Sequence, residues 1–317
     1  MKVWILADDR AGNVNQLLGI AMAFGEPFER KDIRYSKWIC LPNQLRGRTL
    51  IGLTKESKKE LKAPWPDVVL SAGRRSYPAA RYIRKMSGGQ TRIVQLMNPG
   101  SAGFKEASLI VLPAHDRYRG KAKNVMIVTG TPHQITRQKL DKERQKWEKV
   151  FKDYPHKRLS LIVGGATKNK PFTEDAARKL VAGVRALKPE SVLVTTSRRT
   201  PAVVIDVLKN ELPKPFYLYQ FGDPADNPYF GLLACADEIV VTGDSMSMCS
   251  ECCAAGVPVH IFAPDKMMSR KHKRFHQTLY REGYAAPLGK IAESPKGTLN
   301  PAAEIADKIK EVMANDH

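Results

Sequence analysis

Residues 242–251 hold groups that could bind a diphosphate and a ribose. Thr242-Gly243-Asp244-Ser245 follows a short apolar run and precedes a stretch of small residues that favours a helix. A helix starting there would offer the backbone N–H groups of residues such as Met246 and Ser247, and its end carries a partial charge of about +0.5, which suits a diphosphate. Glu251 follows within two turns and could accept hydrogen bonds from ribose hydroxyls. An ordinary serine-capped helix of an α/β sheet explains the same pattern.

Two earlier loops in the same half of the chain also carry groups suited to phosphate. Gly164 and Gly165 end the apolar run 159–163, and a Gly-Gly turn before a helix can surround a phosphate with backbone N–H groups. Their order is not that of a P-loop. Arg198 and Arg199 end another apolar run, where an arginine pair beside a helix N-terminus would form a strong anion clamp.

The first half of the chain has acids, a glycine and cations at comparable positions. Asp8 ends the apolar run 2–7 and is a candidate general base, although an aspartate there could instead cap the helix expected over 14–24. Gly12 would let a substrate approach the backbone closely. His115 is the second candidate base, because an imidazole titrates nearer neutral pH. Other strand ends carry candidate substrate-binding residues, namely Arg74, Asn98 and His133.

The elements that must position these residues are short apolar strands that alternate with helices. Runs such as 67–71 and 109–113 each end in a polar or Gly/Pro turn, as expected of a parallel sheet whose strand ends form the ligand site. The pattern restarts after the charged helix 140–153. We therefore expect an α/β fold with two Rossmann-like parallel-sheet domains, residues 1–153 and 154–317. The last helix, 301–315, can pack back on the first domain.

Composition and charge narrow the compartment and the partners. The chain has 317 residues, is 43% hydrophobic and carries a net charge of +20, which favours partners that bear phosphate. No apolar run reaches the roughly 18 residues of a membrane span, and the apolar start is too short for a signal peptide. Cys249 and Cys252 have a zinc-like spacing, but no second pair completes a site. We expect no bound metal and a cytoplasmic location.

One segment of the first half favours contact with an anionic membrane. Residues 41–62 mix leucine and isoleucine with six lysines and arginines. This mixture suits a peripheral site on the inner face of a membrane, and a solvated helix or loop explains it equally well. The net charge alone would also suit a nucleic-acid partner. No aromatic RNA-binding platform or recognition helix is evident, however, so we expect no nucleic-acid partner.

Two resemblances to known families add expectations of their own. The paired-sheet pattern resembles the GT-B glycosyltransferase architecture, and Ser250-Glu251-x-x-Ala254-Ala255-Gly256-x-Pro258 resembles the donor-binding helix of the MurG-type N-acetylglucosaminyltransferases. This resemblance implies that the two domains face across a cleft, with the acceptor on the first and the nucleotide-sugar on the second. It implies that Glu251 holds the ribose, that residues 245–247 hold the diphosphate, and that neither metal nor cofactor is needed.

The second resemblance spans nearly the whole chain and is to the mitochondrial fission protein family of plants. The matching motifs include Asp8-x-x-Ala11-Gly12, Ser71-Ala72-Gly73-Arg74-Arg75, Asn98-Pro99, Pro113-x-His115-Asp116, Gly130-x-Pro132-His133, Gly164-Gly165, Ser197-Arg198-Arg199-Thr200-Pro201 and Thr242-x-Asp244-Ser245. Bacterial members of that family are treated as candidate glycosyltransferases of the cell envelope. The resemblance implies sugar transfer from a nucleotide-sugar to an envelope or lipid-linked acceptor. A non-catalytic, membrane-associated adaptor on the same scaffold is the alternative.

Overall fold

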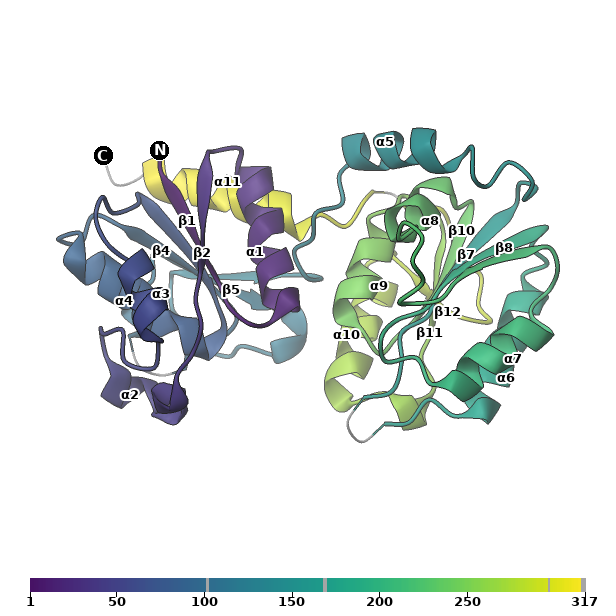
Figure 1. Cartoon of the computed structure of the whole chain (residues 1–317), viewed down its shortest axis with the longest axis horizontal. Helices are drawn as coiled ribbons and strands as arrows, with labels where there is room; N and C mark the ends of the chain where they lie inside the picture. Colours follow the sequence, from purple (N-terminus) through teal and green to yellow (C-terminus); the bar gives the residue numbers. More distant parts are fainter. Residues whose placement is uncertain (101–102, 168–169, 296, 315–317) are drawn as a thin grey trace. The chain divides into compact units, whose positions relative to one another are not determined.

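The computed structural model describes residues 1–100, 103–167, 170–295 and 297–314, and the chain forms two compact units (Figure 1). The first unit comprises residues 1–134 together with the segment that begins at Asn300, and the second comprises residues 135–299. Each unit has its own parallel sheet and its own buried hydrophobic clusters, so each is a complete α/β domain.

The first unit is built on a six-stranded parallel sheet with the strand order β2-β1-β3-β4-β5-β6. Its central strands are mostly apolar because helices cover both faces, so side chains on both faces are buried. The strands are β1 (Val3–Ala7), β2 (Phe28–Asp32), β3 (Val68–Ala72), β4 (Arg92–Leu96), β5 (Leu109–Pro113) and β6 (Val125–Val128).

Helices cover the two faces of this sheet with separate clusters. On one face α1 (Ala11–Phe24) lies beside α11 (Pro301–Ala314), and Leu17 shares a core with Ile305 (Figure 1). The other face is covered by α4 (Gly73–Met86). The shorter elements are η1 (Lys37–Cys40), α2 (Asn43–Arg46), α3 (Lys55–Glu60), η2 (Phe104–Glu106) and η3 (Ala114–Asp116).

The second unit repeats this plan with the order β12-β11-β10-β7-β8-β9, again parallel. Its strands are β7 (Arg158–Ile162), β8 (Ser191–Thr195), β9 (Phe216–Tyr219), β10 (Glu238–Thr242), β11 (Val259–Phe262) and β12 (Ala286–Pro287). Its helices are α5 (Arg137–Trp147), α6 (Glu174–Ala186), α7 (Ala202–Glu211), α8 (Tyr229–Cys235), α9 (Met246–Cys253), η4 (Asp265–Met267) and α10 (Arg270–Arg281).

Each sheet reverses its winding direction once, and this places particular loops side by side. In the first sheet the chain steps from β1 outward to β2 and then returns to β3 on the other side of β1. In the second sheet it steps from β7 through β8 to β9 and returns to β10 on the other side of β7. Ligands of open α/β sheets bind where such a reversal occurs, at the carboxyl ends of the strands. The relevant loops follow β1 and β3 in the first unit, and β7 and β10 in the second.

The boundary between the two units differs from the one expected from the sequence. The units divide between Gln134 and Ile135 rather than after residue 153, because α5 packs on α8 and buries Leu140 and Trp147 in the second unit. Strand β2 is a mostly exposed edge strand, and its sequence has no apolar pattern. Helix α8 begins at Tyr229, directly after a segment rich in turn-forming residues.

Candidate functional site

The carboxylate of Asp244 lies at the centre of the reversal point in the second unit, in the turn between β10 and α9. Its side chain is 1% exposed and forms an ion pair with Arg199 at 2.8 Å. It also accepts hydrogen bonds from the Gly165 amide at 3.0 Å and from the Thr242 hydroxyl at 2.7 Å. One buried acid therefore ties together the loops that follow β7, β8 and β10.

Gly164 and Gly165 allow these loops to touch. A Cβ atom on Gly164 would lie 2.2 Å from the Asp244 carboxylate, and one on Gly165 would lie 2.0 Å from the Arg199 carbonyl oxygen. The Gly164 amide donates to the Thr242 hydroxyl at 2.7 Å. Because both glycine amides already have protein acceptors, the expected phosphate cradle is instead a close-packed joint between loops.

The first turn of α9 has backbone N–H groups that are unpaired within the described residues. The Ser245 hydroxyl caps the helix by accepting from the Met248 amide at 3.4 Å, as the sequence predicted for a helix starting here. The amides of Met246 and Ser247 find no acceptor among the residues that the structure describes. Such orphan donors at a helix N-terminus are suited to an anion such as a diphosphate.

The two adjacent arginines after β8 lie in different environments. Arg199 is bound to Asp244 and also donates to the Ala166 carbonyl at 3.2 Å. Arg198 is exposed, and within the described ranges its guanidinium has no hydrogen-bond or ion-pair partner. Arg198 is thus the cation open to a phosphate, whereas Arg199 holds the turn in place.

Glu251, the predicted ribose-binding residue, lies on α9 and accepts a hydrogen bond from the Tyr229 hydroxyl at the start of α8. Burial raises the pKa of Glu251, while the Tyr229 hydroxyl and the Lys139 ammonium group act in the opposite direction. The Lys139 nitrogen lies 3.4 Å from the centre of the Phe230 ring. Tyr229 was missed from the sequence because it ends a turn-rich segment, and no local pattern places it against Glu251.

His276 of α10 supports the same turn from another element. Its Nε2 lies 2.9 Å from the Gly243 carbonyl oxygen, and burial lowers its pKa to about 4. The ring is therefore neutral near pH 7, and Nε2 carries the hydrogen that it donates, because a carbonyl can only accept. A Cβ atom on Gly243 would lie 2.5 Å from this ring, so glycine is needed for the contact.

In the first unit, Asp8 and Arg75 join the loop after β1 to the first turn of α4. The Asp8 side chain is 3% exposed, and its oxygens accept from the Arg10 amide at 3.0 Å, the Asn13 side-chain amide at 3.2 Å and Arg75 at 3.2 Å. Arg75 also forms an ion pair with Asp9. Asp8 therefore anchors Arg75, and its role as a general base stays a prediction.

The structure places the other predicted residues of the first unit in contrasting surroundings. Arg74 is exposed, and no partner for its guanidinium occurs in the described part of the chain. Asn98 is exposed and closes a local turn by accepting from the amide two residues onward. His115 and His133 are only 4% and 3% exposed, which leaves little of either ring open to a ligand. A Cβ atom on Gly12 would meet no atom within 4 Å, so the space beside it is open.

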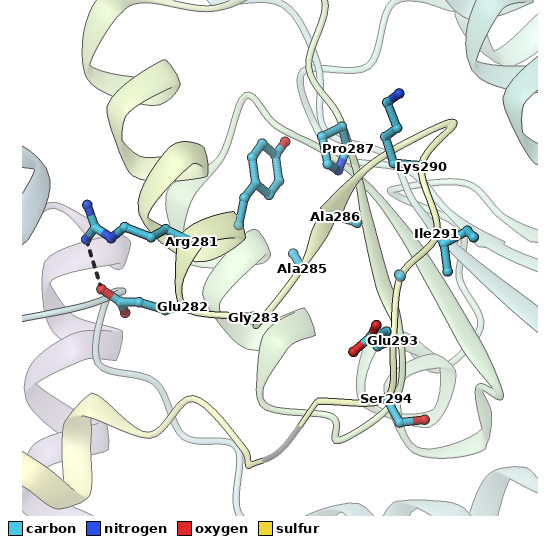
Figure 2. A pocket seen from close by; sticks show the side chains of 12 residues that line it. Arg281, Glu282, Gly283, Ala285, Ala286, Pro287, Lys290, Ile291, Glu293 and Ser294 are labelled. Atoms are coloured by element: carbon cyan, nitrogen blue, oxygen red, sulfur yellow. Dashed lines mark hydrogen bonds and ion pairs between the residues drawn. The ribbon is translucent and has the colours of Figure 1, made fainter.

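A separate hollow of about 490 Å³ lies at the β12 edge of the second sheet (Figure 2). The end of α10 and residues 285–294 form its walls, and an ion pair of 3.2 Å joins Arg281 to Glu282. The lining charges come in both signs, with Lys290 and Glu293 in the facing loop. This hollow therefore lacks the excess of one charge sign that a phosphate site needs.

The described residues contain neither a metal-binding cluster nor a membrane-spanning helix. No group of three or more His, Cys, Asp or Glu side chains there is arranged to hold a metal ion. None of the described helices is both long and apolar enough to cross a membrane. Burial raises the pKa of the Cys249 and Cys252 thiols well above their ordinary value, so both pack as neutral groups.

Two parallel-sheet units, each with its polar site at a reversal point, define the GT-B class of fold. UDP-GlcNAc 2-epimerase from Neisseria meningitidis, solved with UDP-GlcNAc bound, has a TM-score of 0.55 at 13% identity, covering 99% of this chain and 100% of that one. The glycotransferase of kitacinnamycin has a TM-score of 0.51 at 14% identity, covering 98% and 93%. These similarities show the fold and confirm the expected class.

Sequence comparison identifies the family. A model described as mitochondrial fission ELM1 matches residues 11–313, and the chain belongs to this family. An uncharacterized protein of Rickettsia prowazekii, RP120, is 30% identical over 349 aligned positions that cover 98% of each protein. Mitochondrial fission protein ELM1 of Arabidopsis thaliana is 26% identical over 290 positions, covering 83% of this chain and 67% of that protein. The resemblance noted from the motifs is confirmed.

Proposed function

We propose that the chain is a glycosyltransferase that binds a nucleoside diphosphate sugar at the reversal point of its second unit. The observation that carries this proposal is the turn fixed by Asp244. The turn leaves the amides of Met246 and Ser247 and the guanidinium of Arg198 without protein partners in the described ranges. These donors suit a diphosphate, and Glu251 on the same helix suits the ribose.

The same groups would serve the chemical step. When the bond from the sugar's anomeric carbon to the diphosphate breaks, negative charge grows on the leaving diphosphate. Fixed backbone donors and a guanidinium stabilise that charge without rearranging. The burial of Asp244 matters here, because a turn held by hydrogen bonds from several loops keeps its amides oriented before the ligand arrives.

For the acceptor, we propose a role for the first unit. Arg74, an exposed cation at the carboxyl edge of that sheet, would orient a phosphorylated or acidic acceptor. Asp8 is the proposed general base and His115 its competitor. Either would have to exchange present contacts for the acceptor hydroxyl, since both side chains are buried. That burial favours the second candidate function, a non-catalytic, membrane-associated adaptor on the same scaffold.

We propose that the connection between β2 and β3 docks on an anionic membrane. Its side chains Trp38, Leu45 and Ile51 are exposed apolar groups, and Leu45 is 71% exposed. Buried Arg46 makes this connection rigid by donating to the Ile51 carbonyl at 3.1 Å and to a carbonyl of α4 at 2.8 Å. Leu53, expected on the docking surface from the sequence, belongs to the core instead. Exposed apolar groups beside cations are suited to a lipid surface.

Calorimetric titration with a panel of nucleoside diphosphates and their sugars tests the donor site. We expect Arg198→Gln to weaken binding by about 1.5–3 kcal/mol, the range for a hydrogen bond to a charged group. Lys209→Gln on α7 is the matched control, because it removes an exposed cation of the same unit. Equal affinities for the two variants would rule out the site. Sugar transfer or hydrolysis by the wild type then distinguishes the enzyme from the adaptor.

A further inference from the structure

A hollow of about 270 Å³ lies beside α4 in the first unit and has an unusual concentration of positive charge. Four of its six lining residues are cations and one is an acid. A cleft lined by one sign of charge concentrates its field and attracts ions of the opposite sign. The lining residues are Arg48, Arg81, Arg84, Lys85, Gly89 and Glu106.

Two of the arginines are fixed in place by the single acid. Glu106 accepts from Arg81 Nη2 at 2.6 Å and from Arg48 Nε at 2.9 Å. Burial raises the pKa of Glu106, but hydrogen bonds from Arg81 and Arg48 outweigh it and hold the pKa below its ordinary value. Arg81 is buried and also donates to the Gly47 carbonyl at 3.2 Å. Arg81 is therefore held firmly in the wall of the hollow, whereas Arg48, whose side chain is 54% exposed, pairs with the same acid at the surface.

The other two cations have no carboxylate of their own. Arg84 makes only long contacts, to the Thr91 carbonyl at 3.3 Å and to the Ser108 hydroxyl at 3.4 Å. The Lys85 ammonium group has no partner within the described ranges. Both follow Arg81 at helical spacings that bring like charges together, which is unfavourable unless a counter-charge is present. The negative end of α4 offsets part of this repulsion and supplies no ion pair.

A second hollow, of about 350 Å³, continues from the first because the two share Arg84 and Glu106. It adds the cations Arg92 and Lys105. Arg92 begins β4, so this groove reaches the amino ends of the strands, away from the carboxyl edge where Asp8 and Arg74 lie. The groove is therefore separate from the reversal point of the same sheet.

We propose that this groove, beginning at the α4 hollow, binds the phosphate group of a phosphorylated ligand. Arg84 and Lys85 would contact the phosphate oxygens directly, while Glu106 keeps Arg48 and Arg81 in position beside them. Guanidinium groups are well matched to phosphate because their planar N–H groups can donate in pairs. The phosphate comes either from a soluble compound or from a lipid headgroup, and both share the chemistry of a phosphate ester or anhydride with free oxygens.

Calorimetry of the full chain with inorganic pyrophosphate tests the first source. We expect the double variant Arg84→Gln/Lys85→Gln to lose about tenfold or more in affinity, since charge-assisted hydrogen bonds are lost. The control Lys149→Gln/Lys152→Gln removes the same charge from exposed positions of the second unit and should bind as the wild type does. Arg198→Gln weakens binding at the proposed nucleotide site and leaves the groove intact, so it shows how much of the pyrophosphate binding belongs to the nucleotide site.

Flotation with phosphatidylcholine vesicles, with and without phosphatidic acid, tests the second source. Binding that requires phosphatidic acid and is lost only in the groove variant assigns the site to a headgroup. The single variant Lys85→Gln changes an exposed residue and should show an intermediate loss if the double variant is poorly folded. Equal losses in the groove variant and the control, or no binding of either probe by the wild type, would overturn the proposal.

Discussion

Replacing Asp244 by alanine removes the acceptor that joins three loops of the second unit, and the structure indicates how much stability this costs. The carboxylate is buried and accepts from the Gly165 amide, the Thr242 hydroxyl and Arg199. Asp244→Ala leaves each donor without its acceptor while creating no new contact. We therefore expect the second unit to be destabilised and the amides of α9 to lose their fixed orientation.

The size of the effect depends on which donors can recover by binding water. The Arg199 side chain is 40% exposed, so its guanidinium can be rehydrated and contributes little. The Gly165 amide and the Thr242 hydroxyl are buried, and an unsatisfied buried donor costs about 1–3 kcal/mol. Two such donors give an expected loss of about 2–6 kcal/mol in the free energy of unfolding of the second unit.

Hydrogen–deuterium exchange in increasing urea measures this loss, because peptides from residues 135–299 and from residues 1–134 report on the two units separately. Asp265→Ala is the matched control: its carboxylate is 87% exposed and pairs with Lys273 at the surface, so no measurable change is expected. If Asp244→Ala and Asp265→Ala left the second unit equally stable, the carboxylate would not be the structural centre of the site.

Three further outcomes test other parts of the structure. Burial raises the pKa of Glu251 above 4.5, so the contribution of this carboxyl to the stability of the second unit is favourable in acid and is lost as the pH rises. Glu251→Gln should therefore stabilise the second unit against thermal unfolding at neutral pH but not in acid. Gly165→Ala should lower the free energy of unfolding by about 1–3 kcal/mol, because the added methyl group overpacks the joint between loops. Gly12→Ala should raise it by about 0.5–1 kcal/mol, because the position is helical and has open space beside it; urea unfolding measures both changes. Leu45→Ser should reduce co-sedimentation with anionic vesicles while leaving unfolding unchanged.

The elements of the fold could be predicted from the sequence because their signals are local. The apolar run 109–113 is β5, with the expected bounds. The start of α9 was also predictable, since Ser245 is a favoured N-cap residue after an apolar strand. By contrast, α8 is a short helix of apolar residues that follows several turn formers, and its stability comes from packing on α5.

The glycines show where local patterns mislead. Gly164 and Gly165 after a strand match the pattern of a phosphate loop, yet each glycine is required by contact with another loop. The contacting atoms belong to Asp244 and Arg199, which are distant in the sequence. A Gly-Gly pair therefore indicates a close approach to its backbone, and only the tertiary structure shows whether a ligand or the protein makes that approach.

The arginine pairs are a second case in which the local sequence is insufficient, because it does not show which arginine of each pair can bind a ligand. Nothing local distinguishes the first arginine of a pair from the second, because the choice depends on an aspartate 67 residues away in the first unit and 45 residues away in the second. In both units the second arginine binds that buried aspartate, and the first, Arg74 or Arg198, is exposed without a partner in the described ranges. A paired guanidinium has its charge largely neutralised, whereas an unpaired one keeps it for a ligand. In a chain with a net charge of +20, the binding sites are therefore distinguished by which cations lack an acid, rather than by where cations are numerous.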